Sequence, residues 1–275
     1  GFFYLFLFFV LIKFLTLNFT KYTFKIDIFH EGLWLAAAQN LKTTEKFWLS
    51  SYIGRGFFGN FHPYFIWNFL GVETIGSVRL TNLIIILFNK ILLLMIAKKL
   101  TTMIDLKDEI KIIFFILLSI SFLYFVGYGD PIFITRSFLL LLLILLLFQL
   151  FLNFKSNKIL LISIGLFSSL SMFWYVDIGI YFNVTIIILL LFFLYRLEFN
   201  NFLTLTLSSI LSWILIYQLI PTNEFNQFLN NTILIFSTLE YIHGLIYPTP
   251  FLGDIRSTRA ILFFLKTGIF LIFLI

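Results

Sequence analysis

The sequence is poor in charged residues and contains no cysteine. Only 12% of its 275 residues are charged, against roughly 25% in a soluble domain. Without cysteine the chain can form no disulfide, no thiolate nucleophile and no thiolate metal site. It also lacks the glycine-rich loop that cradles a nucleotide phosphate. These absences exclude several classes of soluble enzyme and make the lipid bilayer the solvent to consider.

Long apolar runs take the place of the missing charge, and 61% of the residues are hydrophobic. A helix of about 20 apolar residues crosses a hydrocarbon core about 30 Å thick. We therefore predict an all-α, polytopic membrane protein with about eight transmembrane helices in a single transmembrane domain over 1–275. Because the chain opens on Gly1 without a methionine and ends at Ile275 inside an apolar run, we expect a fragment of a longer protein. The predicted spans are residues 2–18, 74–97, 112–126, 137–153, 159–173, 179–195, 202–220 and 261–275.

The lysines predict the orientation, because positive residues near helix ends stay in the cytoplasm. The connections on the side opposite to most of the lysines, 127–136 and 174–178, contain Arg136 as their only positive residue. We therefore predict a cytoplasmic amino end, with large outer loops at 19–73 and 221–260, in a multi-pass protein of the bacterial inner membrane. The net charge of +6 favours contact with anionic lipid over nucleic acid. The positive residues of the predicted inner side are Lys98, Lys99, Lys107, Lys111, Lys155, Lys158 and Arg196.

Histidine and arginine gather on the predicted outer side. All three histidines, His30, His62 and His243, fall in the two large outer loops, and five of the six arginines lie on that side. A planar guanidinium binds phosphate through two hydrogen bonds, so this set predicts recognition of a phosphate at membrane level. The alternative is that long loops cross the membrane regardless of their charge. The outer arginines are Arg55, Arg79, Arg136, Arg256 and Arg259.

An acidic stretch in the first outer loop carries candidate catalytic groups. If it is helical, Asp27 and Glu31 share one face. Beside His30, the two carboxylates could hold a divalent metal, or one of them could act as a general base. The alternative is that Asp27 caps a juxtamembrane helix and Glu31 faces water. Asp177, between two closely spaced spans, is a further candidate, because charged groups at membrane depth are often functional.

A glycine-rich stretch follows in the same outer loop. Residues 51–63 contain Gly54, Gly56 and Gly59 and end at Pro63. Glycine adopts unusual backbone angles and lets a ligand approach the chain closely. The stretch therefore predicts a loop, and we expect a juxtamembrane helix to follow it. His62 and His243 are kept as further site candidates.

The layout resembles the GT-C class of multi-spanning membrane glycosyltransferases, including its mannosyltransferase-like members, which use lipid-phosphate-linked sugars. The resemblance implies that Asp27 is the base that deprotonates an acceptor hydroxyl, with inversion at the sugar carbon. It also implies that outer basic residues hold the donor phosphate. It rests on a first span followed by Asp27-Ile28-Phe29-His30-Glu31-Gly32 and, more weakly, on Gly54-Arg55-Gly56, Arg136 and Asp177. The phosphate contacts would be Arg55, Arg136, Arg256 or Arg259.

These observations predict a glycosyltransferase acting on hexosyl or pentosyl groups at the outer face. The expected partners are a lipid-linked sugar donor, a lipid or glycan acceptor and membrane lipids, but no nucleic acid. The inner connections are too short for a nucleotide-binding domain, so we expect no nucleotide cofactor, and a divalent metal stays open. A transporter or lipid flippase is the alternative, and a non-catalytic assembly protein is the third. A transporter should bind its substrate near the bilayer midplane, and no Asp or Glu lies deep in a predicted span.

Overall fold

The computed structural model describes residues 1–16, 30–46, 56–105, 107–125, 131–152 and 157–243, and every regular element within them is a helix. The predicted all-α class is therefore confirmed for these residues. The ten helices are α1 (Phe2–Leu15), α2 (His30–Thr44), α4 (Phe57–Leu70), α5 (Ile75–Met103), α6 (Asp108–Phe125), α7 (Pro131–Leu152), α8 (Lys158–Trp174), α9 (Val176–Tyr195), α10 (Phe199–Leu219) and α11 (Thr222–His243).

Seven of the predicted spans coincide with helices to within a few residues: α1 and α5 to α10. The eighth, 261–275, lies outside the described residues. Among the described helices, α5, α9 and α10 are long and apolar enough to cross a membrane, whereas α1, α8 and the part of α7 from Arg136 onward are shorter apolar helices. These three helices suggest a membrane protein, and the number of crossings, predicted as eight, stays a prediction.

The chain divides into two compact units, Gly1–Phe228 and Leu229–Ile275. Helix α11 begins in the first unit and continues into the second. The contacts described below all belong to the first unit. The single transmembrane domain that the sequence predicts stays a prediction.

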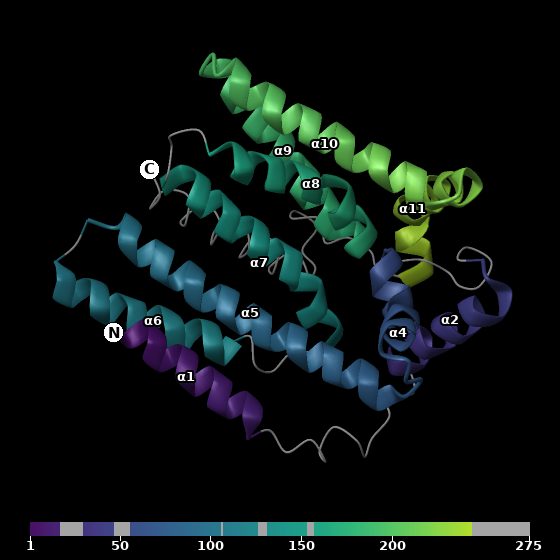
Figure 1. Ribbon diagram of the computed structural model, residues 1–275, viewed down its shortest axis with the longest axis horizontal. Coiled ribbons are helices and arrows are strands. Elements are labelled where there is room, and N and C mark those ends of the chain that lie inside the picture. The colour runs from purple at the N-terminus through teal and green to yellow at the C-terminus, as the bar shows by residue number, and fades with distance from the viewer. Residues whose placement is uncertain (17–29, 47–55, 106, 126–130, 153–156, 244–275) are drawn as a thin grey trace, which may run out of the picture. The chain divides into compact units, whose positions relative to one another are not determined.

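The helices of the first unit pack side by side (Figure 1). Helix α1 packs on α5 and α6, α5 packs on α6 and α7, and α8 packs on α9 and α10. The ammonium of Lys98, near the end of α5, lies 4.9 Å from the ring centroid of Phe3, near the start of α1. The start of α1 and the end of α5 therefore lie at the same end of the bundle, as antiparallel helices require.

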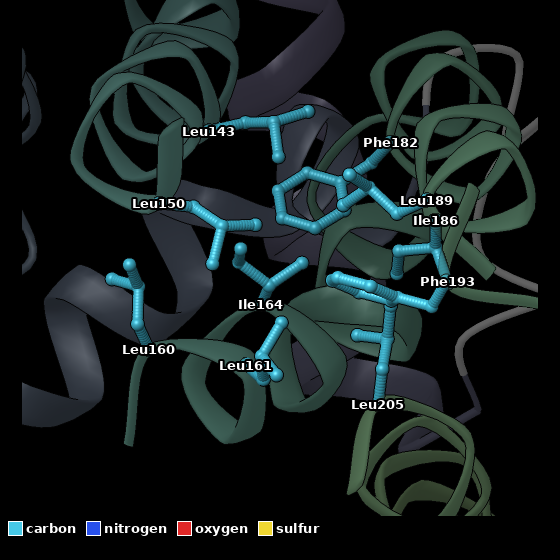
Figure 2. Close-up of a cluster of buried hydrophobic side chains, with 10 residues drawn as sticks. All are labelled: Leu143, Leu150, Leu160, Leu161, Ile164, Phe182, Ile186, Leu189, Phe193 and Leu205. Carbon is cyan, nitrogen blue, oxygen red and sulfur yellow. The ribbon is translucent and has the colours of Figure 1, made fainter. Parts of the chain in front are cut away.

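A core of leucine, isoleucine and phenylalanine joins α7, α8, α9 and α10. Figure 2 shows Leu143, Ile164, Phe182 and Leu205, one from each helix, converging on one another. Lipid tails are as apolar as these side chains, so burial from water does not hold such helices together. Close packing does, because each well-placed carbon contact adds a small dispersion attraction.

Small residues let α8 and α10 approach closely. A Cβ on Gly165 would lie 2.7 Å from the Cβ of Ser208, so no larger residue fits there. Next to it, the Ser169 hydroxyl donates to the Ser212 carbonyl at 2.9 Å, and the Ser212 hydroxyl donates to the Leu166 carbonyl at 2.7 Å. Interhelical hydrogen bonds of this kind contribute about 0.6 kcal/mol each inside membranes. They fix the register of the two helices.

The short link between α4 and α5 has two defined caps. Gly71 ends α4 in the left-handed region, at φ +67°, and its N–H donates to the Trp67 carbonyl. Thr74 then caps α5, with its hydroxyl accepting the N–H of Ser77 at 3.2 Å, as N-cap side chains do. The Trp67 indole N–H also donates to the Thr74 carbonyl at 3.1 Å. These bonds fix where α4 lies against the start of α5.

The loop predicted for 51–63 is wrong from Phe57 onward, because α4 begins there and contains Pro63. Glycine and proline disfavour helix, but tertiary packing decides this segment. Phe61 and Pro63 are buried in the packed interior. The juxtamembrane helix expected after the loop is therefore present, and it starts earlier than predicted.

Candidate functional site

Helices α8 and α9 form a hairpin joined by one residue, Tyr175. A Cβ on Gly179 would overlap the backbone of Met172, so the tight crossing requires glycine at this position. The predicted connection 174–178 is thus too long. Asp177 lies in the first turn of α9, where the helix dipole stabilises a carboxylate.

Helix α4 is attached to this hairpin by close contact. Gly56, at φ +104°, has a conformation that L side chains rarely adopt, and a Cβ there would lie 2.8 Å from the Tyr175 Cα. The rings of Phe58 and Trp174 stack with centroids 3.8 Å apart and planes 9° apart. The glycines and aromatic residues of the first predicted outer loop therefore pack against the residues that precede Asp177.

Arg136 and Asp177 form an ion pair between α7 and α9 at this point. The Arg136 Nη2 donates to the Asp177 Oδ2. Arg136 was predicted in the connection 127–136, but α7 begins at Pro131 and includes it. About a third of each side chain is exposed, 35% for Arg136 and 32% for Asp177. The pair is thus oriented by the protein and partly exposed at its surface.

Glu31 and Arg79 form a second ion pair, which joins α2 to the start of α5. The Arg79 Nε and Nη2 donate to the two carboxylate oxygens of Glu31, each at 2.6 Å. The side chains are only 15% and 18% exposed for Arg79 and Glu31, so the alternative that Glu31 faces water is wrong. With both oxygens engaged, Glu31 fits a positioning role better than that of a general base. Its catalytic role stays a prediction.

His62 is buried inside the packing of α2 and α4. Its ring centroid lies 4.8 Å from that of Trp34 and 5.5 Å from that of Phe58. Neither ring nitrogen has a hydrogen-bond partner within the described part of the chain. Burial lowers the pKa of His62 to about 4. The nearby backbone of Phe58 and Gly59 acts in the other direction and raises the pKa, but burial has the larger effect. The imidazole is therefore neutral at pH 7, and its burial favours a core position over contact with a ligand.

Several predicted site residues lie outside the described residues. No group of three or more His, Asp or Glu side chains within the described ranges is placed to hold a metal ion. A metal bound by Asp27 and His30 thus stays an open prediction. The predicted site residues that the structure does not describe are Asp27, Arg55, Arg256 and Arg259, together with the side chains of His30 and His243.

A polar cluster that the sequence analysis missed lies between α8, α9 and α10. The Asn183 amide donates to the carbonyls of Ser168 and Gly179, at 3.0 and 2.8 Å, and the Trp213 indole donates to the Ser168 hydroxyl at 3.0 Å. The cluster borders a mostly apolar groove of about 470 Å³. An asparagine within an otherwise apolar span was the available signal, because polar groups are expensive in a bilayer.

Comparison of the chain with protein-family models, curated proteins and solved structures finds no match. The function is therefore argued from the residues and their geometry. Of the predicted site residues, Arg136 and Asp177 are brought together. Glu31 is instead paired with Arg79.

Proposed function

We propose that this protein is a membrane glycosyltransferase that transfers a sugar from a polyprenyl-phosphate-linked donor to an acceptor at the outer face. The ion pair between Arg136 and Asp177 carries the proposal. It is partly exposed at the end of the α8–α9 hairpin. It also lies next to residues on which α4, from the first predicted outer loop, packs. An oriented guanidinium suits a reaction in which a phosphate departs.

The chemistry needs a base and a stabiliser of the leaving group. Asp27 would take the proton from an acceptor hydroxyl as its oxygen attacks the anomeric carbon. The bond between that carbon and the phosphate oxygen breaks, and polyprenyl phosphate leaves with the electron pair. Arg136 would stabilise the charge that develops on the phosphate, helped by Arg55, and Arg256 and Arg259 stay predicted phosphate contacts. Because Asp177 holds Arg136 in place before the reaction, little reorganisation is needed, which is the condition under which such charges contribute most.

A lipid-linked donor is also supported by the groove between α8, α9 and α10. Its walls are mostly apolar and include Ile186, Ile210 and Phe225. Phe225 belongs to the start of α11 and packs with Phe173, near the end of α8. The groove therefore reaches the end of the bundle that carries the ion pair. An isoprenoid chain is an apolar ligand that fits such walls.

Transport or lipid flipping is the second candidate, and buried polar groups on α5 favour it. Asn82 and Asn89 are buried on this helix, and Asn89 lies at its middle. The Asn89 amide donates to the Ser137 hydroxyl of α7 at 3.3 Å. A transporter binds its substrate near the bilayer midplane with groups of this kind.

The proposal can be tested by reconstituting the full chain in liposomes with labelled polyprenyl-phosphate hexoses and pentoses and membrane lipid extract as the acceptor. We expect labelled glycolipid with the unaltered chain. Asp27→Asn should abolish transfer while the protein stays inserted and folded, because the amide cannot accept the acceptor's proton. The matched control is Asp105→Asn, an exposed residue of the predicted inner side, which should keep full activity.

Two results would contradict the proposal in different ways. Wild-type rates for Asp27→Asn would reject Asp27 as the base. Movement of labelled donor between leaflets, without any labelled product, would instead favour the flippase.

A further inference from the structure

A second groove lies where α1, α5 and α6 meet. Its volume is about 460 Å³, within the range of ligand pockets, which is roughly 300–1,000 Å³. Phe2 and Phe3 of α1 and Ile112 and Phe115 of α6 give it mostly apolar walls. It is formed by the start of α1, the end of α5 and the start of α6, which is the end of the bundle where the lysines predict the cytoplasmic surface.

Two lysines interrupt the apolar walls of this groove. Lys98 comes from α5 and Lys111 from α6. The Lys98 ammonium lies 4.9 Å from the ring centroid of Phe3, which is a cation–π contact. Within the described part of the chain neither lysine forms an ion pair. The groove therefore has two positive charges and no carboxylate among its lining residues.

Acidic residues lie near this end of the bundle, and a carboxylate within the groove would offset the charge of the two lysines. Asp105 lies between α5 and α6, and Asp108 and Glu109 lie in the first turn of α6. None of the three lines the groove. Carboxylates in a first turn interact favourably with the helix dipole, which offsets part of their charge. The groove itself thus stays complementary to an anion.

We propose that this groove binds an anionic phospholipid of the predicted inner leaflet. Lys98 and Lys111 would hold the phosphate, and the acyl chains would follow Phe2, Ile112 and Phe115. Basic pockets between transmembrane helices on the cytoplasmic side recognise anionic headgroups in this way. A soluble anion would leave the apolar walls in contact with water. A zwitterionic lipid would bring its own cation and gain less from the lysines. This proposal does not depend on glycosyl transfer.

The test measures how much labelled phosphatidylglycerol co-purifies with the full chain from mixed phosphatidylglycerol and phosphatidylcholine vesicles. We expect selective retention of phosphatidylglycerol by the unaltered chain. The double variant Lys98→Gln with Lys111→Gln should lose about 30-fold of that affinity, because each lysine near a charged headgroup contributes about 1 kcal/mol and 1.36 kcal/mol corresponds to a factor of ten. Lys98→Arg with Lys111→Arg should keep it, since the charges remain.

The matched control is Lys99→Gln with Lys107→Gln, which removes two charges from the same end of the bundle but none from the groove lining. Equal losses for both pairs of variants would overturn the proposal, since they would show only a diffuse attraction to an anionic surface. Displacement of the lipid by millimolar inorganic phosphate would also overturn it in favour of a soluble anion. Equal retention of phosphatidylcholine would show that the groove takes lipid without regard to charge, and that result would overturn it too.

Discussion

The two ion pairs of the first unit use the same chemistry in different surroundings. Glu31 and Arg79 meet through two hydrogen bonds and are less than 20% exposed. Arg136 and Asp177 are about a third exposed. The first pair lies with the buried His62 in the closed packing of α2, α4 and α5, and the second lies at the open junction of α7 and α9. The sequence predicts both Arg79 and Arg136 to be outer residues. The structure distinguishes them by burial, because the pair of Arg79 is mostly buried and the pair of Arg136 is partly exposed.

The closed pair and the open pair should therefore respond differently to substitution. Breaking a buried pair leaves a charge that water cannot solvate, and the fold loses stability. Breaking an exposed pair costs at most about 1 kcal/mol, so any large effect there must come from function.

The largest effect is expected for Arg136→Gln in the glycosyl-transfer assay. Removing one preorganised group that stabilises developing charge lowers turnover about 10²–10³-fold, or about 3–4 kcal/mol. The free energy of unfolding in detergent should change by less than about 1 kcal/mol, because the residue is partly exposed. Turnover with a labelled donor and chemical unfolding of the same preparations provide the two measurements.

Arg196→Gln is the control for this substitution, because Arg196 is an exposed arginine that ends α9 on the predicted inner side. It should leave both measurements unchanged. If Arg136→Gln unfolds the protein as readily as it slows transfer, the open pair is structural and the distinction between the two pairs fails.

The next effect is a loss of stability at low pH caused by His62 in the closed region. Its pKa is lowered from 6.5 to about 4 in the folded protein, so the unfolded chain binds the proton more readily. The contribution is complete above pH 6.5 and is lost as the pH falls toward 4, for a total of about 3 kcal/mol. Unfolding curves between pH 7 and pH 4 measure it. His62→Phe should flatten this part of the pH dependence, and an unchanged slope would show that His62 is not buried in its neutral form.

The smallest of the three is the effect of Glu31→Gln on stability. Loss of the charged partner from a mostly buried arginine should lower the free energy of unfolding by about 2 kcal/mol. Asp177→Asn is the matched change in the open pair and should cost less than about 1 kcal/mol. Glu31→Leu combined with Arg79→Met should recover most of the loss, because it leaves no buried charge. Equal costs for Glu31→Gln and Asp177→Asn would remove the contrast between the pairs.

The helices are the part of the structure that the sequence predicts best. Apolar runs such as 74–97 and 202–220 correspond to α5 and α10, because a bilayer leaves an apolar segment few conformations other than helix. Helix α4 was missed from Phe57 to Pro63, since its glycines and proline indicate a loop when read locally. The packing of Gly56 and Phe58 on Tyr175 and Trp174, more than a hundred residues away, is not visible in a local pattern.

The candidate site was predictable as a set of residues but not as a set of pairs. Arg136 and Asp177 were each selected from their position at the ends of spans, and the structure brings them together across 41 residues. Glu31 was selected as a catalytic group, and no local signal indicated that Arg79, 48 residues away, would engage both of its oxygens. Burial and partner choice are tertiary properties, so a single sequence shows which groups are available but not which are occupied.

The one-residue link at Tyr175 couples two parts of the protein mechanically. Phe58 of α4 stacks on Trp174 at one side of the link, and Asp177 follows within three residues on the other side, in contact with Arg136. A link this short has no slack to absorb a displacement. The position of α4 and the position of the carboxylate that pairs with Arg136 are therefore set by the same short link between α8 and α9.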